Sequence, residues 1–289
     1  MRHPDLLPCQ SKPFCGEPRI ELLTDDYITP NHLFYARCHL AIPDIDPEEY
    51  RLIISGKGIK KENGKKGKRK FTLDDLKTKF KKHEVVTTLQ CAGNRREDLH
   101  DRDHKIFIAP HWVIGAMSTA KWGGVKLRDV LEECGIDVDD IALGKVESPF
   151  QHLQLEGYDQ DETGYTYGGS IPWLKAVDGL SEVILAYEMN GEDLPRDHGF
   201  PVRIIIPGNV GARQVKWLHK IKLSDKESDK SYHQKSYLGF SPDVTFENAL
   251  SEWPPKRLDQ APIIQEQPVT SFICNPPQNA IVGESCSIV

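Results

Sequence analysis

Several classes of protein are excluded by what this 289-residue sequence lacks. It contains no run of about 18 or more apolar residues, and its first residues, MRHPDLLPCQSKPF, lack the apolar stretch of a secretory signal. The formal net charge is -6, whereas proteins that bind nucleic acids or membrane surfaces need a broad basic face. We therefore expect neither nucleic-acid nor membrane partners, and we expect any positively charged site to be local.

Cysteine is also scarce: there are seven, an odd number, and no two are spaced as C-x-x-C. Neither a disulfide framework nor a zinc ribbon is indicated, and a reducing compartment is the simplest inference. No internal repeat is visible.

The sequence does contain clear signals for short helices and strands. Thr72 is placed as an N-cap with Asp75 three residues later, which predicts a short helix, and residues 85–90 predict a buried strand. Apolar residues recur at helical spacing over 127–134, and Gly135 ends that helix. Cys134 then reads as a small core residue.

Further strands are predicted over residues 183–189 and 201–206, around an Asn-Gly turn, and over 215–223. Another strand leads into residues 57–70, where lysines and glycines alternate; we interpret this stretch as a solvated hairpin loop, with a docking patch for an anionic partner as the alternative. Strands outnumber helices and do not alternate regularly with them, which favours an α+β fold over a doubly wound sheet.

Three parts of the chain differ in composition. Residues 1–19 are predicted to form an irregular N-terminal arm, and residues 20–253 one large domain. Residues 254–289 are rich in proline and predict a linker with one or two strands, too few to close a sandwich. This last segment either packs on the large domain or begins a further one.

Cys91 is the first candidate for chemistry. A lone cysteine after a buried strand is usually a small hydrophobic residue. Here, however, Gly93 permits a tight turn, and Arg95 and Arg96 provide positive potential that favours the thiolate. A thiolate ligates soft metals or attacks electrophiles, and both possibilities stay open at this point. A catalytic thiol would require a positioned base, and the sequence does not identify one.

A second candidate is the glycine-rich stretch from residue 195 to residue 217. Its cations are suited to a phosphate or another oxyanion, because guanidinium groups and exposed backbone N–H groups can all donate to it. Separate surface charges on loops are the alternative. The five cations are Arg196, His198, Arg203, Arg213 and Lys216.

Weaker candidates lie elsewhere in the chain. Arg37 and His39 share one face if their segment is extended. Tyr237 precedes a turn and can present its hydroxyl to an anion or relay a proton, although a half-buried aromatic is the commoner case. Asp159 can accept hydrogen bonds from a heterocycle or simply shape a turn, and Tyr167 is predicted to be a packing residue.

Four segments, taken in order, closely resemble the molybdenum-cofactor domain of sulfite oxidase: LQCAGNRR, GAMSTAKWGGVKLRDVL, AYEMNGEDLPRDHGFPVRIIIPGNVGARQVKWL and YLGFSP. The resemblance covers roughly residues 20 to 253. It continues into APIIQEQPVTSFICNP, which is similar to the start of that family's immunoglobulin-like dimerisation domain. It implies a sulfite-oxidase-type molybdopterin-binding fold followed by the truncated start of a β-sandwich, and oxidation of sulfite to sulfate.

The resemblance also implies roles for particular residues. Cys91 would ligate molybdenum together with a dithiolate from the pyranopterin, and the substrate pocket would use Arg37, Arg96, Trp112 and Tyr237. The residues implied to hold the cofactor are Tyr35, Ala36, Arg37, Cys38, His39, Asp159, His198, Arg203, Gln214, Val215 and Lys216. Cys38 departs from the family, which more often has asparagine there.

Partners and compartment follow only from the resemblance. No haem domain is expected in this chain, so cytochrome c or oxygen would accept the electrons. The family is homodimeric, but the dimerisation domain would be largely missing here. The mitochondrial intermembrane space is implied, with the peroxisome and cytosol as alternatives. A nitrate-reductase-type core or a non-catalytic molybdopterin-binding fragment are the alternative functions.

Overall fold

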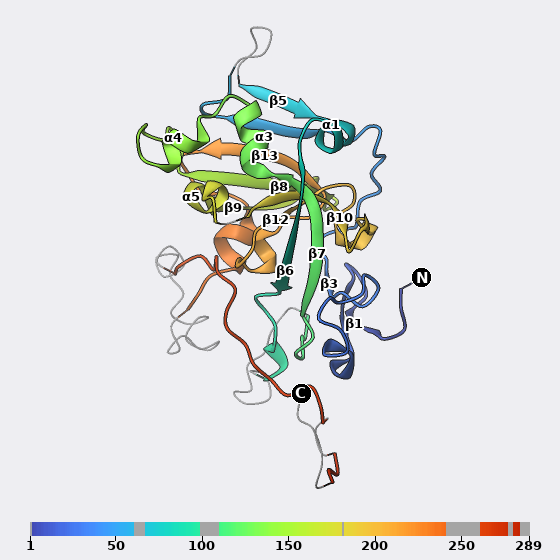
Figure 1. The fold of residues 1–289 in the computed structure, drawn as a ribbon. Coiled ribbons are helices and arrows are strands. Elements are labelled where there is room, and N and C mark those ends of the chain that lie inside the picture. Colours follow the sequence, from blue (N-terminus) through green and yellow to red (C-terminus); the bar gives the residue numbers. More distant parts are fainter. Residues whose placement is uncertain are drawn as a thin grey trace.

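Figure 1 shows a computed structural model of the chain, which describes residues 2–60, 67–98, 110–180, 182–240, 261–276 and 280–283. Within these residues, two five-stranded sheets and one three-stranded sheet are joined by short helices and turns. The predicted α+β class is confirmed. None of the helices in the described ranges is long and apolar enough to cross a membrane.

The strands form three sheets, in which adjacent strands hydrogen-bond in the following order. The small sheet contains β1 (Leu6–Gln10), β2 (Cys15–Pro18) and β3 (Ala36–Arg37). The second contains β11 (Glu192–Asp193), β10 (Ile184–Met189), β7 (Met117–Lys126) and β6 (Lys82–Gln90), and β12 (Arg203–Ile205) also pairs with β10. The third contains β5 (Lys68–Phe71), β4 (Leu52–Gly56), β13 (Leu218–Ser224), β8 (His152–Gln160) and β9 (Thr166–Pro172). Only the pairing of β4 with β13 is parallel among these strands.

The helices are all short, and they lie around the third sheet and the upper end of β7 (Figure 1). They are α1 (Leu73–Thr78), α3 (Leu127–Glu133), α4 (Val138–Ala142) and α5 (Trp173–Val177). Single turns of 3₁₀ helix are η1 (Ile20–Leu23), η2 (Arg196–His198) and η3 (Gly211–Arg213), and η4 (Tyr232–Ser236) is a π-helical turn.

Local sequence signals placed these elements well. Thr72 caps α1, and its hydroxyl and the Asp75 carboxylate each accept the other residue's backbone N–H. Gly135 has a φ of +87° just after α3. This backbone conformation is strained for any residue that has a Cβ. Asn190 and Gly191, with φ of +54° and +85°, form the turn between β10 and β11.

Two predicted strands differ in detail. The strand over residues 85–90 is not buried on both faces: Val85 and Leu89 are buried, whereas Val86, on the opposite face, is 49% exposed. The strand predicted over 215–223 begins only at Leu218, because Val215 and Lys216 still belong to the turn that follows η3. The predicted hairpin around residues 57–70 is present as the antiparallel pair β4 and β5; its tip, residues 61–66, lies outside the described residues.

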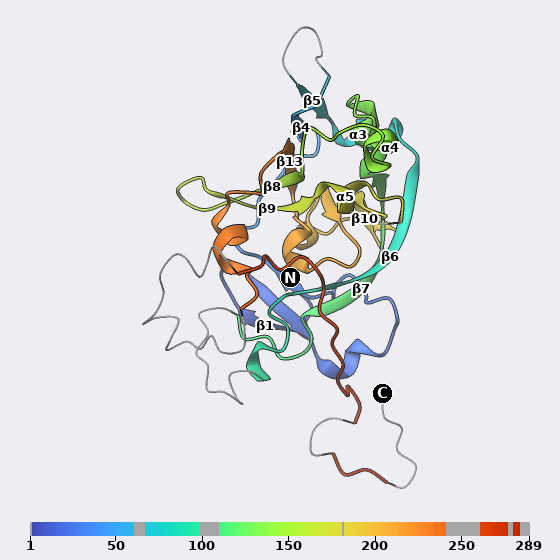
Figure 2. The same cartoon turned by 90° about the vertical axis from the view of Figure 1, so that its left-hand side faces the viewer.

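The N-terminal segment is not irregular as predicted. Residues 6–18 form a hairpin whose second strand pairs with β3, Cys15 opposite Arg37 and Gly16 opposite Ala36. The two strands of the hairpin are adjacent in sequence, with Gln10 opposite Cys15, but their proline and glycine content is atypical of strands. Only the partner of β2 in β3 lies some twenty residues away. In Figures 1 and 2 this hairpin lies beside the lower part of β7.

Part of the C-terminal segment, residues 262–267, packs on the large body. The backbone N–H groups of Gly239 and Val210 donate to the carbonyls of Pro262 and Gln265 at 2.8 and 3.0 Å. The boundary predicted at residue 253 lies outside the described residues, as do residues 284–289, so the division into a large domain and the start of a further one stays a prediction.

Two clusters of buried side chains form the core. The larger lies among the two five-stranded sheets and the helices and includes Leu52, Leu127, Cys134 and Ile204. The smaller lies under the N-terminal sheet and includes Cys91 and other residues near it. Cys134 is therefore the core residue that its helical spacing predicted, whereas Cys91 lies where the second cluster borders a pocket.

Candidate active site

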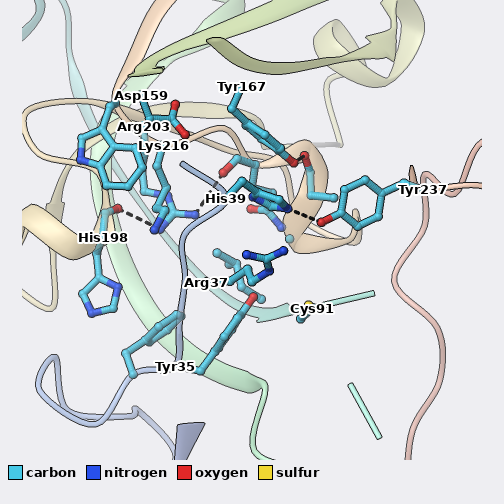
Figure 3. Close-up of a pocket in the computed structure, with 16 residues that line it drawn as sticks. Tyr35, Arg37, His39, Cys91, Asp159, Tyr167, His198, Arg203, Lys216 and Tyr237 are labelled. Atoms are coloured by element: carbon cyan, nitrogen blue, oxygen red, sulfur yellow. Dashed lines mark hydrogen bonds between the residues drawn. The ribbon is translucent and has the colours of Figure 1, made fainter. Parts of the chain in front are cut away.

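One pocket gathers most of the predicted site residues. About 580 Å³ of space, part of it open to solvent, lies between its lining residues. Predicted residues that line it are Tyr35, Arg37, His39, Cys91, Asp159, His198, Arg203, Gln214, Lys216 and Tyr237. Figure 3 shows Cys91 on one side of this pocket, Arg203, Lys216 and Asp159 on the other, and Arg37 between them.

Five other predicted residues do not line the pocket. Ala36, Cys38 and Val215 are buried behind its wall. Trp112 is fully buried, with its ring edge-on to that of Tyr35 at 6.3 Å between centroids. Arg96 folds back over Gly93, where a Cβ would lie 2.3 Å from Nη2, and donates to the Pro110 carbonyl at 2.7 Å. The roles of these residues stay predictions.

The turn after β6 holds Cys91 in place. The Cys91 N–H donates to the Ala116 carbonyl at 2.9 Å, and the Asn94 N–H donates to the Cys91 carbonyl at 3.0 Å. Burial raises the pKa of the Cys91 thiol, while the Gly93 N–H, Arg37 and Arg96 lower it. In the protein alone the thiol therefore keeps its proton, and a metal that binds must displace that proton.

Of the two adjacent arginines, Arg96 lowers the pKa of the thiol, whereas Arg95 is paired elsewhere. Arg95 has a φ of +63° and donates from Nε to Asp98 at 2.6 Å, and its Nη1 lies 3.3 Å from the Ser271 carbonyl. The prediction that both arginines favour the thiolate is therefore wrong for Arg95. Arg37 takes its place: its Nη1 donates to Cys15 Sγ at 3.4 Å and to the Cys38 carbonyl.

The second cluster of cations is divided in the same way. Arg196 is exposed and donates to the carbonyl of Pro43 at 3.0 Å. Arg213 is buried outside the pocket, where it donates to the Ile264 carbonyl at 2.9 Å and contacts His233 Nδ1 at 2.7 Å. The remaining three cations of the predicted cluster do line the pocket.

Arg203 is the most buried of these three. Its Nη1 and Nη2 donate to the carbonyls of His198 and Gln214 at 2.9 and 3.2 Å, and its guanidinium lies 4.8 Å from the Trp122 ring centroid. Its Nε has no hydrogen-bond partner among the described residues. Burial lowers the Arg203 pKa to about 10, so the group still carries its charge at neutral pH.

Lys216 and His198 complete the cationic side. Lys216 Nζ donates to the Asp197 carbonyl at 2.7 Å and to Cys38 Sγ at 3.3 Å. Burial, together with the charges of Lys216 and Arg203, lowers the pKa of His198 to about 3, so the ring is neutral. His198 Nε2 lies 3.3 Å from the Asn31 carbonyl, which assigns the proton to Nε2 and leaves Nδ1 as an acceptor.

Asp159 supplies an acceptor on the same side. Its Oδ1 is buried, and none of the residues that the structure describes donates a hydrogen bond to it. Burial raises the Asp159 pKa to about 7, and Lys216 opposes that rise. Gly157 leaves room for the carboxylate, because a Cβ there would lie 2.5 Å from Oδ1. A buried carboxyl oxygen without a donor in the chain indicates a ligand with N–H groups.

A third set of side chains closes the pocket near Tyr237. The Tyr237 hydroxyl hydrogen-bonds to His39 Nε2 (Figure 3), and the His39 ring stacks on Tyr167 at 4.2 Å between centroids. Burial lowers the pKa of His39 well below its usual value and raises that of Tyr237 to about 12. Both groups are therefore neutral at physiological pH.

Six lining residues were not predicted as site residues. They are Phe34, Leu89, Tyr167, Gly211, Ala212 and Trp217. Most offer only apolar surface, which no motif marks. Gly211 had a usable signal, because it stands in the glycine-rich stretch: a Cβ there would lie 2.7 Å from the Tyr35 hydroxyl.

The pocket fits a molybdopterin. Arg203 and Lys216 suit an anionic phosphate, Asp159 suits the N–H groups of a heterocycle, and Cys91 offers a soft ligand for a metal. Among the described residues, no group of three or more His, Cys, Asp or Glu side chains could hold a metal. A metal at Cys91 would thus take its other ligands from a bound cofactor.

Solved structures and curated sequences similar to this chain agree with that fit. The structure of the sulfane dehydrogenase SoxCD from Paracoccus pantotrophus matches with a TM-score of 0.68 and 23% identity, covering 96% of this chain and 58% of that one. The predicted sulfite-oxidase-type fold is supported by this likeness.

Two curated relatives correspond to two of the predicted alternatives. Mitochondrial sulfite oxidase from Rattus norvegicus is 45% identical over 289 residues, which are 100% of this chain and 48% of the relative. Nitrate reductase [NAD(P)H] from Hordeum vulgare is 38% identical over 257 residues, which are 87% of this chain and 27% of the relative. The chain spans about half the length of the sulfite oxidase that it matches.

The family itself is shown by a direct match. Residues 39–232 match the family described as the oxidoreductase molybdopterin binding domain. Most of the predicted residues that line the pocket lie in this range; Tyr35 and Arg37 precede it, and Tyr237 follows it, by only a few positions. The chain therefore belongs to the oxidoreductase molybdopterin-binding domain family.

Proposed function

We propose that this chain oxidises sulfite to sulfate at a molybdenum cofactor bound between Cys91 and the cationic side of the pocket. The observation that carries the proposal is the placement of a buried thiol and the Arg37 guanidinium in one pocket with unpaired polar atoms of Arg203 and Asp159. The greater identity to a sulfite oxidase than to a nitrate reductase supports this reaction.

The cofactor-binding residues act by charge and by hydrogen bonding. Arg203 and Lys216 bind the phosphate of the cofactor, and Asp159 accepts hydrogen bonds from its pterin ring. Cys91 provides the thiolate ligand to molybdenum. When bound there, the cofactor supplies a two-electron oxidation with oxygen-atom transfer to sulfur.

The substrate-binding residues handle a small anion. Arg37 binds sulfite through its guanidinium group, and Arg96 and Trp112 belong to the substrate pocket by the family resemblance. The Tyr237 phenol donates a hydrogen bond toward the anion, and its own contact with His39 fixes its orientation. In the net reaction, sulfite and water give sulfate, two protons and two electrons.

From the family resemblance, we propose that cytochrome c or oxygen accepts the electrons. A mitochondrial location, in the intermembrane space, and a homodimer are proposed on the same basis. The mitochondrial names of relatives such as the rat enzyme support the first of these. Residues 254–289 would then form the linker and the start of the dimerisation domain.

The test uses the purified full chain. We expect about one molybdenum per chain, measured by metal analysis, and reduction of ferricyanide when sulfite is added. Reduction of nitrate by a reduced dye, without sulfite oxidation, would favour the nitrate-reductase alternative. Molybdenum with neither activity would show a non-catalytic molybdopterin-binding fragment.

A further inference from the structure

Glu17 is a buried carboxylate that the reaction proposed above does not use. It lies in β2 of the N-terminal hairpin and is 6% exposed. Its Oε1 accepts the Val113 N–H at 2.8 Å and its Oε2 accepts the Gly115 N–H at 2.7 Å. A carboxylate that accepts two backbone N–H groups at these distances is a strong and directional contact.

The loop that Glu17 holds is packed tightly against the hairpin. A Cβ on Gly115 would lie 3.0 Å from the Pro18 carbonyl oxygen and 3.1 Å from Glu17 Oε2. The hairpin and the loop thus touch backbone to backbone, and a small displacement of one moves the other.

The next residue of the loop contacts the metal-ligand turn. Ala116 accepts the Cys91 N–H at 2.9 Å, and its own N–H donates to Asn94 Oδ1 at 3.1 Å. Asn94 in turn donates its N–H to the Cys91 carbonyl at 3.0 Å. Both peptide groups of Cys91 are therefore tied, directly or through Asn94, to the loop that Glu17 holds.

The same hairpin also supports Arg37. Cys15 lies opposite Arg37 across β2 and β3, and its Sγ accepts a hydrogen bond from Arg37 Nη1 at 3.4 Å. The hairpin thus contacts the thiol side of the pocket at two points, through separate residues. Figures 1 and 2 show it beside the ends of β6 and β7, where Cys91 and the loop lie.

We propose that Glu17 is a positioning residue for Cys91, which it holds through the loop of residues 113–116. The expected effect on kcat rests on the proposed function, whereas the expected effect on hydrogen–deuterium exchange does not. Glu17→Gln keeps the size of the side chain but replaces one acceptor oxygen by an NH₂ group, which faces a backbone N–H. One of the two contacts is then lost, and the turn at Cys91 is released.

The experiment measures the turn and the reaction separately. In the full chain with its cofactor, hydrogen–deuterium exchange of residues 91–96 is expected to be about tenfold faster in Glu17→Gln, with exchange in α3 unchanged. Sulfite-dependent reduction of ferricyanide is expected to show a kcat about tenfold lower and an unchanged KM, since residues that orient a metal ligand typically contribute 10- to 100-fold. Glu21→Gln, at an exposed site in η1, is the matched control and is expected to change neither quantity.

The outcomes are decisive in each direction. Unchanged exchange at residues 91–96, or an equal acceleration throughout the chain, would overturn the proposal, because Glu17 would then only stabilise the fold. If Glu17→Gln does not fold, Gly115→Ala tests the same contact, and it must also accelerate exchange at residues 91–96. If the unaltered chain does not oxidise sulfite, the proposed function fails, but the exchange measurement still decides the role of Glu17.

Discussion

The two sides of the pocket are held in place by different means. The cationic side is held mainly by local contacts: Arg203 and Lys216 donate to carbonyls of residues 197, 198 and 214, all in one stretch of chain. Cys38 and Asn31 add one contact each from a distant segment. The thiol side is assembled from distant segments, because Cys91 is tied to Ala116 and Arg37 to Cys15. One side can thus bind an anion as a unit, whereas the geometry of the other depends on how the whole domain folds.

A substitution at Cys91 is the most direct test of this difference between the two sides. Cys91→Ser replaces the soft sulfur ligand by a hydroxyl, and we expect sulfite oxidation to fall by roughly 10³-fold or more while the pterin is still bound by the cationic side. Pterin fluorescence after release and ferricyanide reduction measure the two effects. Cys134→Ser, in the core far from the lining residues, is the control and should reduce stability only. Near-normal turnover in Cys91→Ser would remove Cys91 from the mechanism.

A substitution at Arg203 is expected to weaken cofactor binding, which the Cys91 variant keeps. Arg203→Met removes a buried charge whose Nε has no partner among the described residues, and we expect roughly 100-fold weaker cofactor binding, about 2.7 kcal/mol, within the range of charged hydrogen bonds. The molybdenum and pterin contents of the purified protein should fall together. Arg196→Met is the matched control at an exposed position and should leave both contents unchanged. Full cofactor content in Arg203→Met would show that this guanidinium does not bind the cofactor.

The same contrast explains what the sequence could predict. The capping box at Thr72 and the Asn-Gly turn at residue 190 are short-range signals, and the structure contains both. The cationic stretch is likewise local, so its residues were found together. The composition of the stretch does not distinguish Arg203 from Arg213, because the two differ in how strands and turns far along the chain pack against them. Only the family resemblance selected Arg203, which lines the pocket.

The thiol side shows the complementary limit. The strand and turn at Cys91 were predicted from adjacent residues. The N-terminal hairpin was not, because its strands contain Pro8, Gly16 and Pro18, which are residue types depleted in strands. The further pairing of Cys15 with Arg37 spans about twenty residues. The prediction for Arg95 is wrong for a related reason. Its positive φ turns its side chain toward Asp98, and a backbone conformation of that kind leaves no mark in the composition of a motif.

Asp159 allows the cationic side to be tested without the cofactor. Its folded-state pKa of about 7 lies above the usual value of 3.8, so the folded chain binds the proton more tightly than the unfolded chain does. The stability that this proton contributes is complete below pH 4 and is lost as the pH rises through 7. The full shift corresponds to about 4 kcal/mol, and relaxation around the charge reduces this to about 2 kcal/mol.

Asp159→Asn should remove that pH dependence. We expect the difference in unfolding free energy between the variant and the unaltered chain, both without cofactor, to increase by about 2 kcal/mol in favour of the variant from pH 4 to pH 7.5. Urea unfolding at the two pH values measures it, and subtracting the two proteins cancels the other titrating groups. A pH-independent difference would mean that Asp159 is ionised in the folded chain at all of these pH values.

A substitution at Arg37 tests substrate binding on the thiol side, whereas the substitution at Cys91 tests the metal ligand. Arg37→Gln removes the charge that we propose binds sulfite but keeps a hydrogen-bond donor, and we expect the KM for sulfite to rise about tenfold with a smaller change in kcat. Steady-state kinetics with ferricyanide as acceptor measure both. Because the cationic side is intact, molybdenum content should not change. An unchanged kcat/KM would mean that Arg37 only supports the fold.

The smallest effect is expected where the two sides meet. Cys38 follows Arg37 directly, and its Sγ accepts a hydrogen bond from Lys216 at 3.3 Å, so one short segment contacts both sides. Cys38→Asn introduces the residue that the family resemblance leads us to expect at this position, and its side-chain oxygen can accept the same bond. Lys216 also keeps its bond to the Asp197 carbonyl at 2.7 Å.

We therefore expect cofactor content and kcat/KM in Cys38→Asn to change by less than about threefold, which corresponds to well under 1 kcal/mol. Cys38→Ala removes the acceptor altogether and is expected to lower cofactor content more than Cys38→Asn does. If both variants lose the cofactor equally, the thiol itself is required, and the link between the two sides depends on sulfur. If neither changes it, Lys216 is positioned by Asp197 alone, and the two sides of the pocket are independent at this point.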